Sequence, residues 1–234
     1  MDFFIVKKDK VSSTNDILKQ HAAEYESGTV LTAEEQAAGK GRMNRPFFSP
    51  PTGLYFSVLL KDIKDNPASL TVKAAVAVMK GIYDTFGIKT QVKWVNDIIL
   101  DGRKVCGILT EGSFSGEKLS YAVVGIGINI STESFPEKIK SIAGSLNESC
   151  ERKYFLLEKI LENFGRIIEG NDDGNYLEFY KKKCLTLNRK VRLILQDNFM
   201  EEAFAIDIGS NAELIVKKES GEIKKVFYGE AKII

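Results

Sequence analysis

The chain has 234 residues, and its 33 basic and 32 acidic side chains leave a formal net charge of +1. That balance argues against a protein whose main partner is duplex nucleic acid, because such domains usually carry a clear basic excess. Since 44% of the residues are apolar and 10% are aromatic, the composition also excludes a disordered chain and suits one large domain, alone or with a small second one.

No segment is typical of a signal peptide or a membrane span. The apolar start Phe3–Val6 is shorter than a signal-peptide core of ~7–15 residues. The charge-free stretch Pro46–Leu60 is interrupted by three prolines, whereas a spanning helix needs ~20 mostly apolar residues. Cys106, Cys150 and Cys184 form no CxxC pair, which excludes a disulfide framework and a cysteine zinc site. We therefore expect a soluble, cytoplasmic protein.

Strands and helices alternate along the first part of the chain. Strands are predicted over Phe3–Val6, Thr29–Ala33 and Leu54–Leu60. Ser12–Asn15 supplies capping residues for a short helix after the first strand. The segment Leu70–Phe86 has apolar residues at three- and four-residue steps and predicts a long helix. Between them, Glu35–Thr52 predicts a long loop, and a loop of this length is usually functional or mobile.

The middle of the chain predicts a hairpin and further strands. Asp101-Gly102 is a strong two-residue hairpin signal, because a type I′ turn needs positive φ at both positions. The predicted strands are Gln91–Trp94, Ile98–Leu100, Val105–Leu109 and Leu119–Ile130. Helices are predicted over Tyr154–Ile168 and Tyr176–Cys184.

The sequence pattern of the last fifty residues differs from that of the rest of the chain. Short predicted strands cover Val191–Leu195, Phe204–Ile208, Glu213–Val216 and Ile223–Tyr228. Turn signals, among them Asp197-Asn198, separate these strands and indicate a small β-barrel. The boundary is predicted near Thr186–Arg189, which gives one domain over 1–186 and a second over 187–234.

Three segments carry residues suited to chemistry. In Gln36–Arg45, two glycines free the backbone to fold around a ligand, and Lys40, Arg42 and Arg45 add cations suited to phosphate or carboxylate oxygens. This loop is neither a P-loop nor a dinucleotide fingerprint. Taken alone, a solvated basic loop is the commoner interpretation.

Each of the other two segments also allows more than one interpretation when it is taken alone. Lys93–Asp97 contains Trp94, most often a core residue in a strand, and Asn96-Asp97, most often a turn. Lys104 begins a predicted strand beside Gly107, where a ligand could approach closely. Gly125–Asn129 places alternate glycines in a buried strand, which indicates something packed on the backbone, most often a helix.

Together the three segments resemble the biotin–protein ligases. The family's Gly-Arg-Gly-Arg-x-x-Arg-x-Trp run corresponds to Gly39–Phe47, and its Lys-Trp-Pro-Asn-Asp run corresponds to Lys93–Asp97. The further matching segments are Ser13–Asn15, Lys104–Glu111, Gly125–Asn129 and Tyr228–Glu230. Order and spacing agree over nearly the whole chain.

Three positions depart from the family pattern. Lys40 stands for an arginine, which keeps the charge and loses the planar donor fork. Val95 stands for a proline, which should loosen a turn, and Phe47 stands for a ligand-covering tryptophan with more area. The chain also begins directly at the catalytic region, so no N-terminal helix-turn-helix and no repressor activity or DNA partner are expected.

The resemblance implies a fold and a reaction. The fold is α+β, with helices packed on a mixed β-sheet and a small C-terminal SH3-like β-barrel. The reaction joins biotin to ATP as biotinyl-5′-AMP and passes biotin to a lysine of a carrier domain in a biotin-dependent carboxylase. Magnesium is the implied cofactor, no membrane partner is expected, and a homodimer is expected because relatives often dimerise.

The resemblance also implies site residues. Arg42, Lys104 and Asp97 are the implied catalytic residues, and Asp97 is also a candidate magnesium ligand. The implied biotin-binding residues are Ser13, Thr14, Asn15, Gln36, Lys40, Gly41, Arg42, Lys104 and Gly107. The implied ATP- and adenylate-binding residues are Gly39, Lys40, Arg42, Arg45, Phe47, Lys93, Asn96 and Asn129.

Two alternatives stay open from the sequence. The first is a lipoate or octanoate ligase or transferase on a similar fold, whose transferase branch uses a cysteine nucleophile. Cys106 is the only cysteine near the predicted site and is interpreted as a small core residue. The second is a non-catalytic biotin binder, or a module whose lysine-containing β-rich tail binds nucleic acid.

Overall fold

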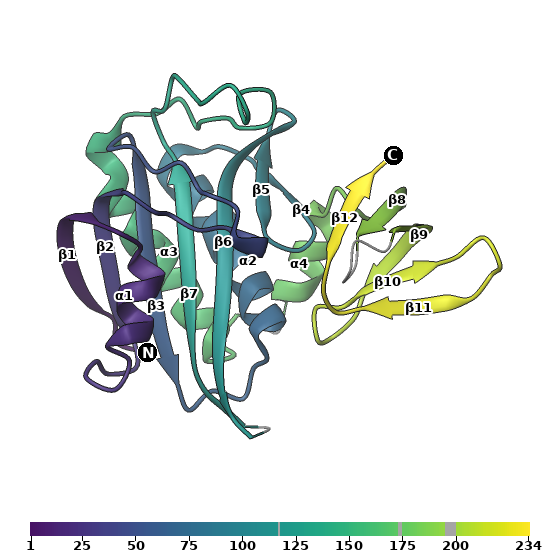
Figure 1. Cartoon of the computed structure of the whole chain (residues 1–234), viewed down its shortest axis with the longest axis horizontal. Helices are drawn as coiled ribbons and strands as arrows, with labels where there is room; N and C mark the ends of the chain where they lie inside the picture. Colours follow the sequence, from purple (N-terminus) through teal and green to yellow (C-terminus); the bar gives the residue numbers. More distant parts are fainter. Residues whose placement is uncertain (117, 173–174, 195–199) are drawn as a thin grey trace.

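Two β-sheets form the frame of the protein (Figure 1). The structure is a computed structural model that describes residues 1–116, 118–172, 175–194 and 200–234. The larger sheet has seven strands in the order β1-β2-β3-β7-β6-β5-β4, and the smaller has five in the order β11-β10-β9-β8-β12. The strands of the larger sheet are β1 Phe4–Val11, β2 Thr29–Gln36, β3 Gly53–Lys61, β4 Gln91–Lys93, β5 Asp97–Leu100, β6 Arg103–Ser115 and β7 Lys118–Asn129.

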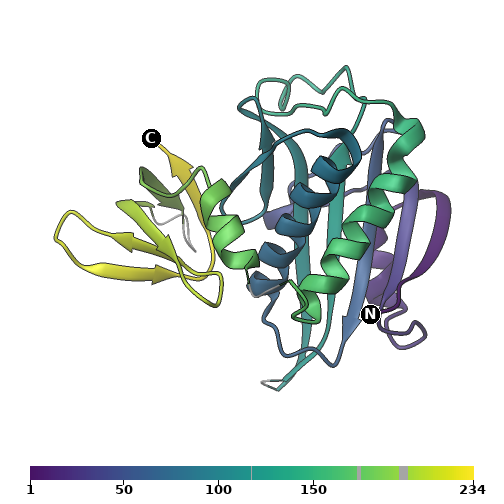
Figure 2. The ribbon, with the colours of Figure 1, turned by 180° about the vertical axis from the view of Figure 1, so that it is seen from behind.

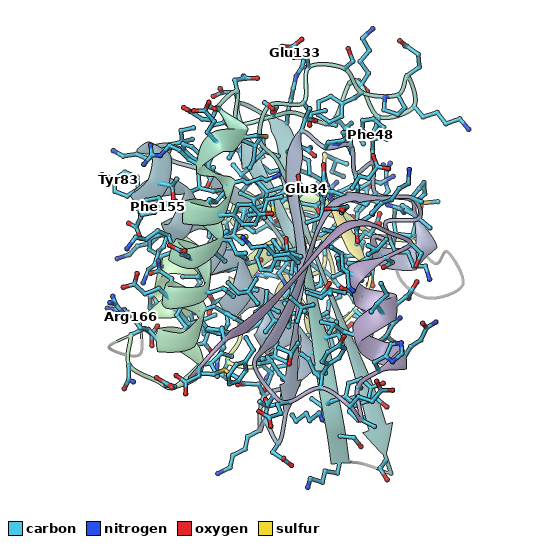
Figure 3. All side chains as sticks on the ribbon, turned by 90° about the vertical axis from the view of Figure 1, so that its left-hand side faces the viewer. Glu34, Phe48, Tyr83, Glu133, Phe155 and Arg166 are labelled. Atoms are coloured by element: carbon cyan, nitrogen blue, oxygen red, sulfur yellow. The ribbon has the colours of Figure 1, made fainter. Side chains whose placement is uncertain are left out.

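The larger sheet is mixed, as expected for the predicted α+β class. Strands β1 and β2 are parallel, and every other neighbouring pair in it is antiparallel. The helices are α1 Thr14–Gln20, α2 Pro67–Phe86, α3 Lys153–Ile168 and α4 Tyr176–Lys183, with the short 3-10 turns η1 Arg42–Asn44 and η2 Cys150–Arg152. Helices α2 and α3 lie side by side on one face of the sheet, and α1 lies on the other (Figures 2 and 3).

The covered faces explain the apolar pattern of the central strands. Every residue of β3 except Lys61 is buried, because α1 covers one face of the strand and α2 with α3 covers the other. A Cβ at Gly81 of α2 would lie 2.6 Å from Ile160 Cγ1 of α3. The absence of a side chain at Gly81 therefore lets the two helices approach closely.

Several elements are longer than the sequence predicts. Helix α2 begins at Pro67, because the Asn66 side chain caps it by accepting a hydrogen bond from Ser69 N at 2.9 Å. Strand β1 continues to Val11 through mostly exposed residues, as an edge strand whose charges discourage pairing with other chains. The hairpin turn is confirmed, since Asp101 and Gly102 both have positive φ, 48° and 76°.

The C-terminal sheet confirms a small second β-unit. It comprises β8 Arg189–Ile194, β9 Met200–Ile208, β10 Leu214–Lys217, β11 Ile223–Val226 and β12 Glu230–Ile233, all in antiparallel pairs. Leu195 and the expected Asp197-Asn198 turn lie outside the described residues. Trp94 joins the two sheets by donating from Nε1 to the Ala212 carbonyl at 3.0 Å. A boundary at residue 186 stays a prediction.

Among the described residues, no helix combines the length and apolar character required to cross a membrane.

Candidate functional site

A small cleft opens above the middle of the larger sheet, where strands β6 and β7 meet the N-terminus of α1 and the loop after β2. Its volume is about 30 Å³. The lining residues are Ser13, Thr14, Asn15, Gln36, Lys40, Gly41, Phe47, Asn96, Lys104, Gly107, Ile108, Leu109, Gly125, Ile126 and Gly127. Four segments that are far apart in the sequence therefore contribute to one cavity.

Glycines and the ring of Phe47 shape the cleft. Gly107 of β6 and Gly127 of β7 are register partners, so their bare backbones lie side by side. A Cβ at Gly127 would be 2.5 Å from Phe47 Cε1, and one at Gly107 would be 3.0 Å from Phe47 Cε2. The Phe47 ring thus rests on both glycines and accounts for the small volume. A ligand much larger than this volume can enter only if the ring moves.

One end of the cleft is a network of neutral polar side chains. Ser57 Oγ lies 2.6 Å from both Thr14 Oγ1 and Asn15 Oδ1, and its single proton is donated to one of these two oxygens. Gln36 Oε1 accepts from the Thr14 backbone N–H at 2.9 Å, and its Nε2 donates to Ser49 Oγ at 3.1 Å. The network fixes the rotamers of groups that could bind a polar head such as a ureido ring.

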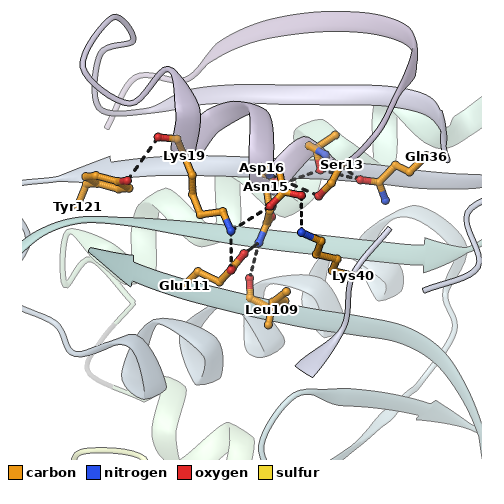
Figure 4. A network of polar contacts seen from close by, with 11 residues as sticks. Ser13, Asn15, Asp16, Lys19, Gln36, Lys40, Leu109, Glu111 and Tyr121 are labelled. Atoms are coloured by element: carbon orange, nitrogen blue, oxygen red, sulfur yellow. Dashed lines mark hydrogen bonds and ion pairs between the residues drawn. The ribbon is translucent and has the colours of Figure 1, made fainter. Parts of the chain in front are cut away.

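A chain of charges borders this network (Figure 4). Asp16 forms ion pairs with Lys40 at 2.6 Å and with Lys19 at 3.0 Å. Lys19 also forms an ion pair with Glu111 at 2.7 Å. Burial by itself would raise the pKa of Asp16, but the hydrogen bonds from Lys40 and Lys19 outweigh it and lower that pKa. The Lys40–Asp16 pair therefore holds the glycine-rich loop against α1.

Lowering the pH should weaken the Lys40–Asp16 ion pair that holds the glycine-rich loop against α1. Because the pKa of Asp16 is lowered in the folded protein, its contribution to stability is complete above an unfolded pKa of about 3.9 and is lost as the pH falls through the folded value. We expect Asp16→Asn to be less stable than the parent near neutral pH and to lose less stability on acidification. Urea midpoints between about pH 3 and pH 6 measure this; parallel pH curves for the two proteins would contradict it.

Gly125 is packed tightly against Asn15 of the polar network. A Cβ there would overlap Asn15 Oδ1 and lie 2.8 Å from Asn15 Cγ. We expect Gly125→Ala to destabilise the protein by about 1–3 kcal/mol, as overpacked sites do. The matched control is Gly41→Ala, whose Cβ would meet only Arg45 O at 3.5 Å. Equal urea midpoints for the two variants would show that this contact relaxes freely.

The opposite end of the cleft is cationic and is organised by the Asn96-Asp97 turn. Arg42 Nη1 donates to Asn96 Oδ1 at 3.4 Å, and Lys104 Nζ forms an ion pair with Asp97 at 2.5 Å. Asn96 itself is held by Nδ2 donating to the Ile108 carbonyl at 2.8 Å. Two cations from distant segments are therefore attached to adjacent residues, and Lys104 lines the cleft. The Trp94–Val95 peptide bond just before this turn is cis.

The C-terminal sheet contributes to the same end. Arg42 Nη2 donates to the Gly229 carbonyl at 2.6 Å, and Arg45 pairs with Glu230 at 2.5 Å. Burial lowers the pKa of Arg42, while the nearby Glu230 and Asp97 carboxylates act in the opposite direction. Gly229 and Glu230, at the start of β12, thus contact two arginines of the glycine-rich loop.

Six of the predicted site residues do not line the cleft: Arg42 and Asp97, whose contacts are given above, and Gly39, Arg45, Asn129 and Lys93. Gly39 accepts a backbone hydrogen bond from Phe47 N at 2.8 Å and so shapes the loop. Arg45 is directed to Glu230. Asn129 donates from Nδ2 to the Gly144 carbonyl at 2.8 Å, although its Oδ1 is buried without a partner in the described part of the chain. Lys93 stands at the end of β4, where it is the register partner of Asp97.

Sequence reasoning missed the supporting charges. The sequence patterns assign no role to Asp16 or Lys19, and Glu111 stands only at the end of the Lys104–Glu111 segment. Their one sequence signal is the three-residue spacing of Asp16 and Lys19 on a helix, which brings the two side chains together. For the Gly229 carbonyl the one signal is the family match over Tyr228–Glu230, because every residue offers a backbone acceptor.

In the described part of the chain, the cleft offers neither a reactive cysteine nor a cluster of metal-binding side chains. Cys106 is fully buried in the apolar core, and that burial raises the pKa of its thiol far above the ordinary value. A reactive nucleophile requires a lowered pKa and access, so Cys106 serves as a core residue. Within the described ranges, no three His, Cys, Asp or Glu side chains are grouped so as to hold a metal ion.

Comparisons with known proteins agree with this geometry. Residues 8–129 match the Biotin/lipoate A/B protein ligase family. The bifunctional ligase/repressor BirA of Bacillus spizizenii is 38% identical over 158 residues, which cover 64% of this chain and 48% of that protein. BirA of Escherichia coli K12 is 28% identical over 231 residues, covering 94% of this chain and 71% of that protein. The chain spans about half the length of the first of these curated relatives.

Solved structures extend the similarity to the whole chain. The biotin protein ligase from Aquifex aeolicus in complex with biotin and ATP has a TM-score of 0.82 and 27% sequence identity, covering 98% of each chain. The match includes the C-terminal sheet and supports the predicted α+β fold with its small C-terminal β-unit. Because the family match extends over more than half of the sequence, this chain belongs to the biotin/lipoate A/B protein ligase family.

Proposed function

We propose that this protein activates biotin with ATP as biotinyl-5′-AMP and transfers it to a lysine of a biotin carrier domain. The observation that carries the proposal is the pair of cations, Arg42 and Lys104, attached to the adjacent residues Asn96 and Asp97 beside a glycine-floored cleft. Relatives named biotin–[acetyl-CoA-carboxylase] ligase and the biotin and ATP complex of the Aquifex aeolicus protein support it.

The first half-reaction must bring two anions together. The biotin carboxylate attacks the α-phosphorus of ATP, a P–O bond forms, and the bond to pyrophosphate breaks. Positive charge placed where the two anions meet lowers this barrier. We assign Lys104 to the carboxylate and α-phosphate and Arg42 to the phosphate. Lys40 and Arg45 would add positive charge at this point. Lys93, Asn96 and Asn129 would bind the nucleotide.

The polar end of the cleft suits the other end of biotin. Ser13, Thr14, Asn15 and Gln36 would hold the ureido head, and the bare backbones of Gly107 and Gly127 leave room for the apolar body. Phe47 must leave its place on these glycines and would then cover the bound ligand. Gly39 and Gly41 give the loop its backbone freedom. A closed loop would keep water from the mixed anhydride.

The second half-reaction needs a neutral amine. The carrier lysine attacks the carbonyl carbon, an amide bond forms, and AMP leaves. Asp97 is the carboxylate available to orient this amine or accept its proton, provided that the amine takes the place of Lys104 beside it. Magnesium bound to ATP would shield phosphate charge, and Asp97 fits as one carboxylate ligand because such sites use one or two carboxylates plus substrate phosphates.

The test is incubation with labelled biotin, ATP, magnesium and a biotin carrier domain. Label on the carrier lysine, with equimolar pyrophosphate, supports the proposal. Pyrophosphate release without carrier labelling would limit the protein to adenylate formation, and binding without pyrophosphate would make it a biotin binder. Faster labelling with lipoate or octanoate would favour the related ligases. Sedimentation at increasing concentration tests the proposed homodimer.

A further inference from the structure

A second cavity shares no lining residue with the cleft. It is formed partly by α2, one of the helices on the covered face of the larger sheet (Figure 2). It opens between the second half of α2, the segment leading into β4, and the end of α4. Its volume is about 200 Å³, against about 30 Å³ for the cleft. The lining residues are Met79, Lys80, Tyr83, Asp84, Ile88, Lys89, Thr90, Phe179 and Lys183.

The walls are apolar and partly aromatic. Met79 is 3% exposed and lies on the buried side, and Ile88 with Phe179 is partly buried against the core. Tyr83 projects from α2 and is 52% exposed (Figure 3). An apolar cavity of roughly 150 Å³ can take up benzene. The space therefore accommodates one aromatic ring or an alkyl chain of similar bulk.

The charges around the cavity favour an anion. Lys80, Lys89 and Lys183 contribute three ammonium groups, and none of them forms an ion pair within the described part of the chain. Lys80 Nζ lies 5.6 Å from the centre of the Phe179 ring. The single acidic lining residue is Asp84, whose carboxylate accepts a hydrogen bond from Asn163 at 3.0 Å.

We propose that this cavity binds a small monocarboxylate with an aromatic or alkyl body. The body would fill the space between Met79, Ile88 and Phe179, and the carboxylate would lie among the lysines. This site is separate from the cleft and does not depend on the activity assigned there. The ligand we expect is an amphiphilic anion and not a phosphate, because most of the cavity lining beyond the rim is apolar.

The test uses a fluorinated phenylpropanoate as the probe, observed by fluorine NMR on the full-length protein. We expect saturable binding that saturating biotin and ATP do not displace, with much weaker binding of the corresponding uncharged alcohol. Lys183→Gln should weaken the carboxylate by about fivefold, the upper range for an exposed ion pair. Lys182→Gln is the matched control, since Lys182 is exposed on the same helix and does not line the cavity.

A further variant makes the outcome decisive. Ile88→Trp should fill the cavity and abolish binding. Urea midpoints would show that each variant is folded. Equal affinity for the alcohol, displacement by biotin, or unchanged binding in both Ile88→Trp and Lys183→Gln would each overturn the proposal.

Discussion

Replacing Lys104 by Met is expected to lower kcat for biotinyl-adenylate formation by about 10²–10³, the usual cost of removing one preorganised donor from a site of charge development. Lys104 lies on the wall of the cleft and is held by Asp97 at 2.5 Å. In the proposed reaction, this ammonium group would lie where the biotin carboxylate and the α-phosphate meet. Pyrophosphate release under saturating substrates measures the effect.

The kinetic pattern separates transition-state stabilisation from simple binding. If Lys104 acts mainly on the developing charge, kcat and kcat/KM should fall together, whereas a ground-state contact would raise KM for biotin at constant kcat. The control is Arg103→Met, which removes a cation from the preceding, exposed position of β6. An equal loss of rate in both variants would show that general charge, and not the position of Lys104, controls the reaction.

Much of the fold follows from local sequence patterns. The Asp101-Gly102 turn was predictable because few residue pairs adopt positive φ at both positions. Helix α3 was predicted to within one residue of its start, because its apolar side chains recur at helical spacing. Strand β6 was predicted too short. Its polar continuation through Ser115 pairs with β7, and pairing across a hairpin is not visible in a single strand's composition.

The site depended on information that local patterns do not contain. Gly107 and Gly127 become neighbours only through the β6–β7 register, so neither glycine alone indicates a cleft. Arg42 donates a hydrogen bond to a backbone carbonyl 187 residues later in the chain, that of Gly229. A backbone acceptor has no sequence signature of its own. The cleft could be anticipated from the family's motifs, whereas the charges of Asp16, Lys19 and Glu111 required the three-dimensional structure.

Replacing Arg42 by Gly should release the adenylate from the protein. Arg42 is the one side chain in the described part of the loop that bonds both to the Asn96-Asp97 turn and to the C-terminal sheet, through Asn96 Oδ1 and the Gly229 carbonyl. Hydrogen bonds to a charged group contribute on the order of 1.5–3 kcal/mol each. Losing them should speed adenylate release by about 10²-fold, even where the adenylate still forms.

Released adenylate is a reactive mixed anhydride, so the variant should also lose selectivity. We expect biotin on lysines of an unrelated protein such as albumin, together with weaker labelling of the carrier domain. Rapid filtration of protein loaded with labelled biotin and ATP gives the release rate, and blotting for biotin gives the selectivity. Arg42→Lys should restore part of the retention, because it keeps the charge and one donor but not the fork.

A matched variant separates the lost anchor from simple loop flexibility. Met43 is the next residue of the loop, is 59% exposed and has a φ of 56°, a conformation that glycine adopts without strain. Met43→Gly should therefore keep the adenylate as well as the parent does, although it loosens the same loop. If it leaked as fast as Arg42→Gly, retention would depend on loop stiffness. If Arg42→Gly retained the adenylate and labelled only the carrier, the contacts to Asn96 and Gly229 would have no role in closing the site, and the assignment of Arg42 would fail with them.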